Sequence, residues 1–330
     1  MLNASRTGAG RRVFIAACSF VAAALVATPA SAQLDENSLA KRRGQGSWLR
    51  KFKASYASLT TYMGSGTLIT SGQNNPYVSQ ELLLYPRFNF AKNQSIRGLW
   101  SMECEMTETD RPSGRHCDPS DVRLSYHHVG LWRDPWLEGR VMGFGAVYLP
   151  TSYASRARNT VLNIRLGVGY LFNVWKLQFS YFLLGTKYFQ TQKTLDAGGS
   201  AEGCNPRAGA AGCSGGPLND NFLVMNSFGA MLSFAKGWSF QWSFITYNFF
   251  RYSVEDNAVA GEGLPLTGRA DFWRNIFTLN YMPNGHVLLS LGLDTFQAVR
   301  NADRSLRNPF YSPTPYDNTS RFYLSGTFLY

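Results

Sequence analysis

The stretch from Val161 to Asn173 reads Val-Leu-Asn-Ile-Arg-Leu-Gly-Val-Gly-Tyr-Leu-Phe-Asn. Every second residue from Leu162 to Phe172 is apolar, and the residues between them include Asn163, Arg165 and two glycines. Side chains of a β-strand alternate between the two faces of its sheet, so a period of two predicts a strand with one apolar and one polar face. This stretch therefore favours an all-β fold.

The same alternation recurs along the chain. With this stretch there are twelve such segments, at 53–63, 77–90, 94–104, 121–133, 139–149, 160–173, 175–190, 222–235, 238–253, 271–282, 286–298 and 319–330. Most reach the roughly 9–11 residues that a tilted strand needs to cross a membrane, and they exceed the usual 5–6 residues of soluble strands.

The connections between these segments alternate in length. Short links lie at 91–93, 134–138, 173–174, 236–237 and 283–285, and long ones at 64–76, 105–120, 150–159, 191–221, 254–270 and 299–318. A soluble sandwich has no reason to place every long loop at one end. A transmembrane antiparallel β-barrel does, because it has short periplasmic turns and long extracellular loops.

Composition is compatible with this fold. Hydrophobic residues make up 45%, aromatic residues 15% and charged residues 16% of the 330 residues, and mean hydropathy is −0.20. So many aromatic and aliphatic residues exclude intrinsic disorder. After the N-terminus no apolar run reaches the roughly 18 residues of a spanning helix, which excludes a helical membrane bundle.

The first 32 residues have the pattern of a secretory signal peptide. Arginines at positions 6, 11 and 12 precede an apolar run at 13–27 and the small-residue site Ala30-Ser31-Ala32, after which we expect cleavage. Two other interpretations stay open: the paired arginines resemble a twin-arginine signal, and Ile15-Ala16-Ala17-Cys18 resembles a lipobox.

Removal of residues 1–32 takes away three arginines and no acid, so the net charge falls from +11 to +8. Residues 33–52 then form a basic periplasmic segment, and 53–330 form the barrel. The basic residues near the first strand are Lys41, Arg42, Arg43, Arg50, Lys51 and Lys53. For an exported protein this cluster favours lipid headgroups or acidic sugars over nucleic acid, and a solvated tail is the alternative.

Four cysteines remain after cleavage: Cys104, Cys117, Cys204 and Cys213. An even number in an exported chain indicates disulfides. Pairing of neighbours, Cys104 with Cys117 and Cys204 with Cys213, is the simplest of the three possible connectivities. No C-x-x-C is present and only His116 lies nearby, so we expect neither a metal site nor a cofactor.

The C-terminal segment carries a resemblance to a known class. It ends on an aromatic residue, with apolar residues in step on one face: Phe322, Leu324, Phe328 and Tyr330. This resembles the terminal strand of Gram-negative outer-membrane β-barrel proteins of the porin or channel type. The resemblance implies recognition by the barrel-assembly machinery after unfolded secretion, which disfavours the twin-arginine route. It also implies an integral outer-membrane protein contacting lipid and lipopolysaccharide, with both termini periplasmic.

Aromatic residues near the strand ends fit the girdles at the two membrane interfaces. They are Tyr56, Tyr62, Trp100, Trp132, Trp136, Trp175, Trp238 and Trp273.

The polar faces of the strands hold the candidate functional residues. These are Glu81, Arg87, Arg97, Glu103, Arg123, Arg165, Arg274, Asp294 and Arg321. A charge facing lipid at mid-depth costs roughly 2–4 kcal/mol, so we expect all of them to face the lumen. Six arginines against three acids predict a narrow, anion-favouring channel for acidic sugars or carboxylates. In size and wall it resembles twelve-stranded channels for acidic oligosaccharides.

Three other functions stay open. The arginines could pair with Glu81, Glu103 and lumen hydroxyls to hold a closed barrel together. A Ser–His site for lipid hydrolysis is a second alternative, but Ser125 and His127 are expected about 6.5–7 Å apart at Cβ, too wide for reliable contact. Adhesion or anchoring through the outer loops is a third, and the glycine-rich loop 191–221 is a candidate plug.

Overall fold

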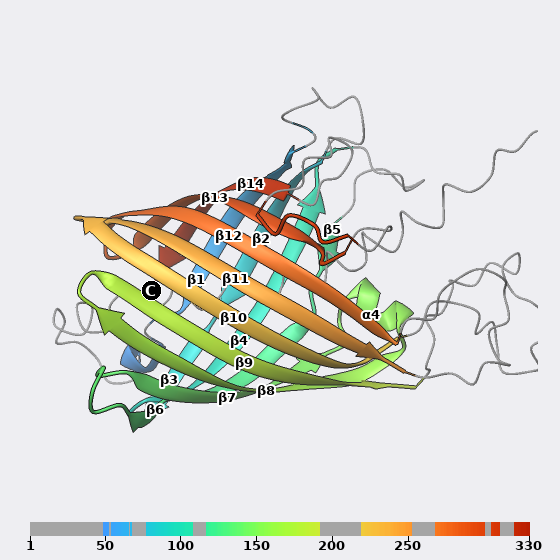
Figure 1. Cartoon of the computed structure of the whole chain (residues 1–330), viewed down its shortest axis with the longest axis horizontal. Coiled ribbons are helices and arrows are strands. Elements are labelled where there is room, and N and C mark those ends of the chain that lie inside the picture. The colour runs from blue at the N-terminus through green and yellow to red at the C-terminus, as the bar shows by residue number, and fades with distance from the viewer. Residues whose placement is uncertain are drawn as a thin grey trace, which may run out of the picture.

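The structure is a computed structural model that describes residues 49–52, 54–65, 67, 77–107, 117–191, 219–252, 268–300, 305–310 and 320–330. The signal peptide, the basic residues before position 49, Cys204 and Cys213 lie outside these residues, so their predictions stay predictions. The described strands form one closed antiparallel barrel with twelve positions around its circumference (Figure 1).

The strands of the wall follow the predicted segments with shifts of at most three residues. They are β1 (Tyr56–Gly64), β2 (Val78–Tyr85), β3 (Arg87–Ala91), β4 (Gln94–Glu105), β6 (Val122–Arg133), β7 (Arg140–Leu149), β8 (Thr160–Val174), β9 (Leu177–Gln190), β10 (Asp220–Ala235), β11 (Trp238–Arg251), β12 (Arg269–Asn284), β13 (Val287–Ala298) and β14 (Ser320–Leu329). The expected fold class is confirmed.

The barrel closes between the first and last strands. β1 pairs with β14 over its whole length, from Tyr56 opposite Leu329 to Gly64 opposite Arg321. The Tyr330 amide donates to the Ser55 carbonyl at 2.9 Å and extends the seam. Because β1 also pairs with β2, and β2 with β4, the sheet has no free edge within the described wall.

One predicted strand is split into β2 and β3 by Pro86. Proline has no amide hydrogen and cannot donate to the ladder. The chain opposite adapts at Gly98, whose amide donates to the Pro86 carbonyl at 2.8 Å. A Cβ at Gly98 would lie 2.9 Å from the proline ring, so this close approach requires a glycine.

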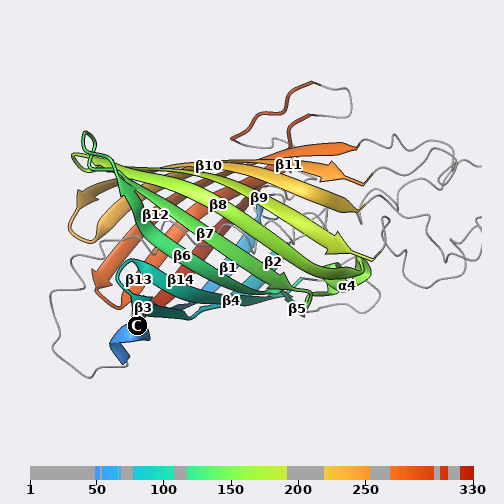
Figure 2. The ribbon, with the colours of Figure 1, turned by 90° about the horizontal axis from the view of Figure 1, so that it is seen from below.

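The two ends of the barrel differ. One end has the tight β3–β4, β6–β7, β8–β9, β10–β11 and β12–β13 turns, together with the start of β1 and the end of β14 (Figure 2). We call it the short-turn end. The other, the long-connection end, carries two small elements that the sequence did not predict, α4 (Tyr153–Ala157) and β5 (Cys117–Pro119).

Local chemistry explains individual short turns. Gly237 has φ +77, and a Cβ there would lie 2.6 Å from the Met282 carbonyl oxygen, so the β10–β11 turn needs glycine. In the β6–β7 turn the Asp134 carboxylate accepts from the Tyr170 hydroxyl at 2.5 Å and from the Trp136 amide at 2.9 Å. The hydrogen bond from Tyr170 lowers the pKa of the Asp134 carboxyl.

The outer face of the wall is apolar. On β8 it exposes Ile164, Leu166 and Val168, and β13 and β14 expose Leu291 and Leu324, each between 37% and 65% accessible. This face is the one that a bilayer would cover. Separately, no helix among the described residues is both long and apolar enough to cross a membrane.

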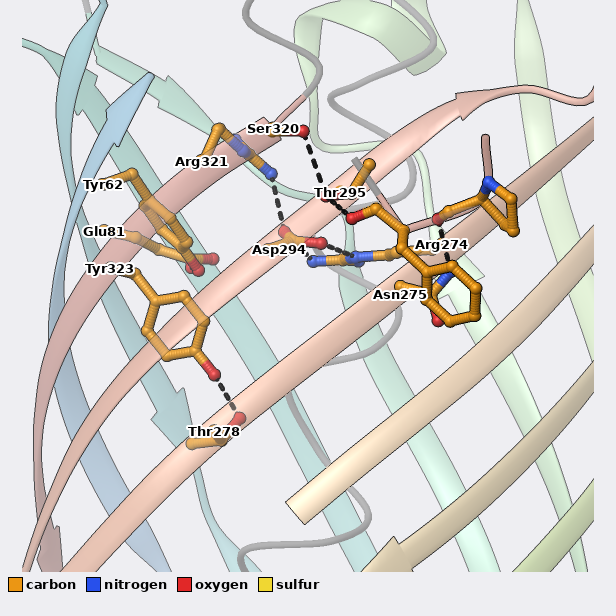
Figure 3. A network of polar contacts seen from close by, with 12 residues as sticks. Tyr62, Glu81, Arg274, Asn275, Thr278, Asp294, Thr295, Ser320, Arg321 and Tyr323 are labelled. Carbon is orange, nitrogen blue, oxygen red and sulfur yellow. Dashed lines mark hydrogen bonds and ion pairs between the residues drawn. The ribbon is translucent and has the colours of Figure 1, made fainter. Parts of the chain in front are cut away.

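A short segment covers part of the outer face near the long-connection end. We call residues 305–310 the outer strap. They follow β13 and turn back on its end, where the Arg307 amide donates to the carbonyl of Val299, the residue after the strand, at 3.0 Å. Beneath the strap, outward side chains donate to its carbonyls, Asn275 to Pro309 at 2.5 Å and Thr295 to Phe310 at 3.1 Å (Figure 3). Neither side chain is exposed, so the strap hides polar groups that would otherwise face the membrane.

Candidate functional site

The nine charged residues expected in the lumen occupy inward positions of their strands. On β2 and β4 the inward residues are largely buried while their neighbours in sequence are more accessible, and the same alternation holds around the barrel. The structure divides the inward side chains into three groups, defined below by their residues: a paired wall, an arginine wall and an apolar wall.

The paired wall lies on β12, β13 and β14 and reaches β2 and β4. Arg274 forms a two-pronged ion pair with Asp294, with Nε–Oδ1 and Nη2–Oδ2 both at 2.6 Å. Arg321 donates to the same Asp294 carboxylate at 3.2 Å (Figure 3). It also lies 3.9 Å from the Glu103 carboxylate. All four side chains are at least nine-tenths buried.

The two glutamates of the paired wall stand directly opposite one another, Glu81 on β2 and Glu103 on β4. Glu81 accepts from the Tyr62 hydroxyl at 3.0 Å. Glu103 accepts from the Ser79 hydroxyl at 2.5 Å and from the Tyr77 hydroxyl. Two guanidiniums and three carboxyl groups meet in this wall, so it adds no net positive charge to the lumen.

The arginine wall consists of Arg97 on β4, Arg123 on β6 and Arg165 on β8. Its partners are neutral: Arg97 donates to Ser95 Oγ at 3.0 Å and Tyr85 Oη at 3.1 Å, and Arg165 Nε donates to Thr186 Oγ1 at 2.8 Å. Among the described residues, no carboxylate lies within 4.0 Å of these three guanidiniums.

Tyrosine rings complete the arginine wall. The guanidinium carbons of Arg165 and Arg123 lie 4.9 Å and 5.9 Å from the centre of the Tyr148 ring, within the range of cation–π contact. In this described part of the barrel, Arg123 Nε and the hydroxyls of Tyr56 and Tyr148 are buried without a hydrogen-bond partner. Unsatisfied buried polar atoms are costly, so these atoms are candidates for contact with a ligand.

A fourth arginine, Arg87, lies directly opposite Arg97 of the arginine wall. Arg87 on β3 is the cross-strand partner of Arg97, and its Nε donates to Asn89 Oδ1 at 2.8 Å. Both arginine side chains are half-buried. Like charges opposite one another in an antiparallel pair repel, so this arrangement keeps the local potential positive.

The apolar wall covers the inner face from β7 to β13. Its fully buried layer contains Leu223, Ile245 and Tyr247, and half-buried Phe144, Phe272 and Phe296 pack against it. The rings of Phe272 and Phe296 are stacked with centroids 5.3 Å apart. The apolar wall shares strands β8, β12 and β13 with Arg165, Arg274 and Asp294, so the inner face carries apolar and charged side chains next to one another.

Sequence reasoning missed the apolar wall. The signal was present in β11, where the apolar residues stand at even positions up to Phe244 and at odd positions from Ile245 to Phe249, so the apolar face changes sides within the strand. Two tyrosines expected in the interfacial girdle, Tyr56 and Tyr62, were also misplaced; they face inward and are 7% and 6% exposed.

The expectation that Ser125 and His127 are too far apart for contact was wrong. His127 Nε2 lies 3.0 Å from Ser125 Oγ, because both side chains lean toward each other on the inner face of β6. The Ser125 hydroxyl also lies 3.3 Å from the Arg97 carbonyl, and the His127 ring stacks on Phe144. The charged groups acting on His127 are arginines, and no described carboxylate orients it, so the geometry lacks the third group of a hydrolase triad.

Several remaining predictions can be placed. Cys104 and Cys117 form the expected disulfide, which joins β4 to β5. No group of three or more metal-ligating side chains occurs within the described ranges. The C-terminal residues Phe322, Leu324, Phe328 and Tyr330 lie on the outer face, each at least 40% exposed.

Similarity to solved structures agrees with this architecture. The outer-membrane channel of Pseudomonas putida F1 titled COG4313 superposes with a TM-score of 0.53 at 10% identity, covering 88% of this chain and all of that one. The chain has the fold of an outer-membrane β-barrel. The sequence matches no protein-family model and no curated protein.

Two porins show weaker similarity. A NanC porin has a TM-score of 0.44 at 13% identity and covers 84% of this chain and 99% of its own. A KdgM porin in complex with oligogalacturonate has a TM-score of 0.42 at 8% identity, covering 83% and 99%. Because both TM-scores are below 0.5, the fold assignment rests on the first similarity.

Proposed function

We propose that this protein is an outer-membrane channel for small, preferentially anionic solutes, either carboxylates or acidic sugars. The observation that carries the proposal is the arginine wall, where Arg97, Arg123 and Arg165 face the lumen with neutral partners. Guanidinium groups bind carboxylates through paired hydrogen bonds and are charged at every physiological pH. A lumen with such a wall attracts anions and repels cations.

The paired wall supports this assignment by contrast. Its two arginines are matched by Asp294 and Glu103, so they add little positive potential to the lumen. The positive potential of the lumen is therefore set by the arginine wall. Twelve strands enclose a lumen between the side-chain-filled barrels of eight strands and the wide porins of sixteen or more, which suits small solutes.

The proposed orientation follows from the two ends of the barrel. We place the short-turn end and both chain termini in the periplasm, and the long-connection end outside the cell, as is usual for such barrels. The disulfide between Cys104 and Cys117 then lies toward the oxidising exterior. Export by a signal peptide at 1–32, assembly by the barrel-assembly machinery, and contacts with lipid and lipopolysaccharide belong to the same proposal.

Ion selectivity in a planar bilayer tests the function. We expect the refolded protein to open discrete channels whose reversal potential in a KCl gradient has the sign of an anion preference. Replacing the arginine wall with Arg97→Gln, Arg123→Gln and Arg165→Gln together should remove most of that preference.

The matched control is Arg133→Gln, because Arg133 lies at the short-turn end with its side chain 65% exposed. This variant should keep the anion preference. A cation preference of the unmodified protein, or folded protein without any conductance, would reject the proposed function and favour the closed-barrel alternative.

A further inference from the structure

We propose that the lumen binds a carboxylate whose body is aromatic or aliphatic, at the junction between the arginine wall and the apolar wall. This inference rests on the proposed channel function and narrows its solute from anions in general to amphiphilic monocarboxylates. The site is formed by Arg97 on β4, Arg123 and His127 on β6, and Phe144 on β7.

The charged half of the site is a pair of guanidiniums on adjacent strands. Arg97 lies opposite Ser125 and Arg123 opposite Leu99, so the two arginines are diagonal neighbours on the inner face. Arg97 is half-buried and open to the lumen, whereas Arg123 is 8% exposed. The buried Arg123 Nε and the buried Tyr56 hydroxyl have no hydrogen-bond partner among the described residues, so this half keeps donors that a ligand can use. A carboxylate supplies the missing negative charge and acceptors.

The apolar half begins directly beside the charged one. The ring of Phe144 stacks on that of His127, with centroids 5.3 Å apart and planes 13° from parallel. A Cβ built on Gly167, the cross-strand partner of Phe144, would lie 2.5 Å from the Phe144 ring, so the ring covers that glycine and occupies its place on the inner wall. Phe144 is half-buried and packs against the buried layer of the apolar wall. Phe144 thus borders the charged half of the site from the apolar side, between the His127 ring and the apolar wall.

Because the charged and apolar halves are adjacent, the site disfavours carboxylates whose remaining atoms are polar and hydrated. An acidic sugar that placed its carboxylate on Arg97 and Arg123 would bring hydroxyl groups against Phe144, where they lose hydrogen bonds to water. A phenyl or alkyl body loses none and removes apolar surface from water. The same site therefore distinguishes two anions of equal charge by the polarity of the part that carries the carboxylate.

The test compares three ligands on the detergent-solubilised full chain by isothermal titration calorimetry. The ligands are 3-phenylpropanoate, glucuronate with the same charge and a polar body, and 3-phenylpropanol with the same body and no charge. We expect 3-phenylpropanoate to bind at least tenfold more tightly than either of the others. Protein-free detergent gives the reference for partitioning into micelles.

Variants assign the binding to this site. Arg97→Gln should weaken 3-phenylpropanoate at least tenfold and leave 3-phenylpropanol unchanged. Phe144→Thr, which keeps a residue with high strand propensity, should weaken 3-phenylpropanoate and leave glucuronate unchanged. Arg133→Gln is the control for a general loss of positive charge, and heat-dependent migration on a gel verifies that each barrel is folded. If one substitution prevents folding, the other still tests its half of the site.

The outcomes separate this inference from the function on which it rests. Anion-selective conductance with equal binding of glucuronate and 3-phenylpropanoate rejects the amphiphile site and leaves the channel intact. Selective binding of 3-phenylpropanoate by a barrel without anion-selective conductance rejects the channel and retains the binding site. Binding that survives both Arg97→Gln and Phe144→Thr overturns the placement of the site.

Discussion

The paired wall and the arginine wall contain the same residue type, used for opposite purposes. In the paired wall Arg274 and Arg321 converge on the single carboxylate of Asp294. In the arginine wall the guanidiniums of Arg97 and Arg123 contact, among the described residues, hydroxyl groups and a tyrosine ring but no carboxylate. Buried ion pairs stabilise a particular structure, because removing one partner leaves the other as an uncompensated buried charge. Arginines without acids hold a positive potential that a solute can use. The role of an arginine in the lumen can therefore be inferred only when it is known whether a carboxylate of the protein pairs with it.

The largest effect is expected at Asp294. Asp294→Asn removes the carboxylate shared by Arg274 and Arg321 and leaves two buried guanidiniums poorly compensated. We expect a loss of about 3–5 kcal/mol in the free energy of unfolding, measured by urea titration in lipid or detergent.

The control for this variant is Asp271→Asn, because the Arg269–Asp271 pair has side chains 57% and 34% exposed. Exposed pairs contribute about 0–1 kcal/mol. Similar losses for the two variants would show that the paired wall is not a structural clamp.

A smaller loss is expected at Glu103. Glu103→Gln keeps an oxygen that can accept from Ser79 but removes the charge facing Arg321 at 3.9 Å. Because Arg321 retains Asp294, we expect a loss of about 1–3 kcal/mol, the usual range for a buried polar group that loses a charged partner. An effect as large as that of Asp294→Asn would mean that the two acids act as one unit, which a double variant would reveal as non-additivity.

The opposite sign is expected in the arginine wall. Arg123→Gln removes a buried donor that has no partner among the described residues, so stability should stay the same or rise by about 1 kcal/mol. The same urea titration measures it. A loss comparable to that at Glu103 would contradict the division of the lumen into a structural and a functional wall.

The smallest effect concerns salt. Between 0.1 M and 1 M salt the screening length falls from about 10 Å to about 3 Å. We expect the anion preference, measured as reversal potential at a constant concentration ratio, to weaken modestly over this range. The contribution of the buried Asp294 ion pairs to the free energy of unfolding should not change over this salt range. If it weakened together with the anion preference, the paired wall and the arginine wall would not have separate roles.

Sequence patterning predicted the wall of the barrel because period-two alternation is a local property of the chain. It predicted which charges share the polar faces for the same reason. Sequence patterning could not predict which charges form ion pairs. Arg274 contacts Asp294 because of the register of β12 against β13, which is a contact between strands. The apolar wall was missed because the apolar face changes sides within β11: Ile245 and Tyr247 point inward, whereas Trp242 and Phe244 before them point outward. The contact of Ser125 with His127 depends on side-chain rotamers that strand spacing does not determine.

The outer strap has a consequence for how the barrel sits in its bilayer. Asn275 and Thr295 face outward only three to six residues from the long-connection ends of their strands, and the strap satisfies them there. Hydrocarbon chains therefore meet apolar side chains below this level and a polypeptide ridge above it. On that side the apolar height available to acyl chains is shorter than the strands themselves, so the lipid-facing belt is uneven around the barrel.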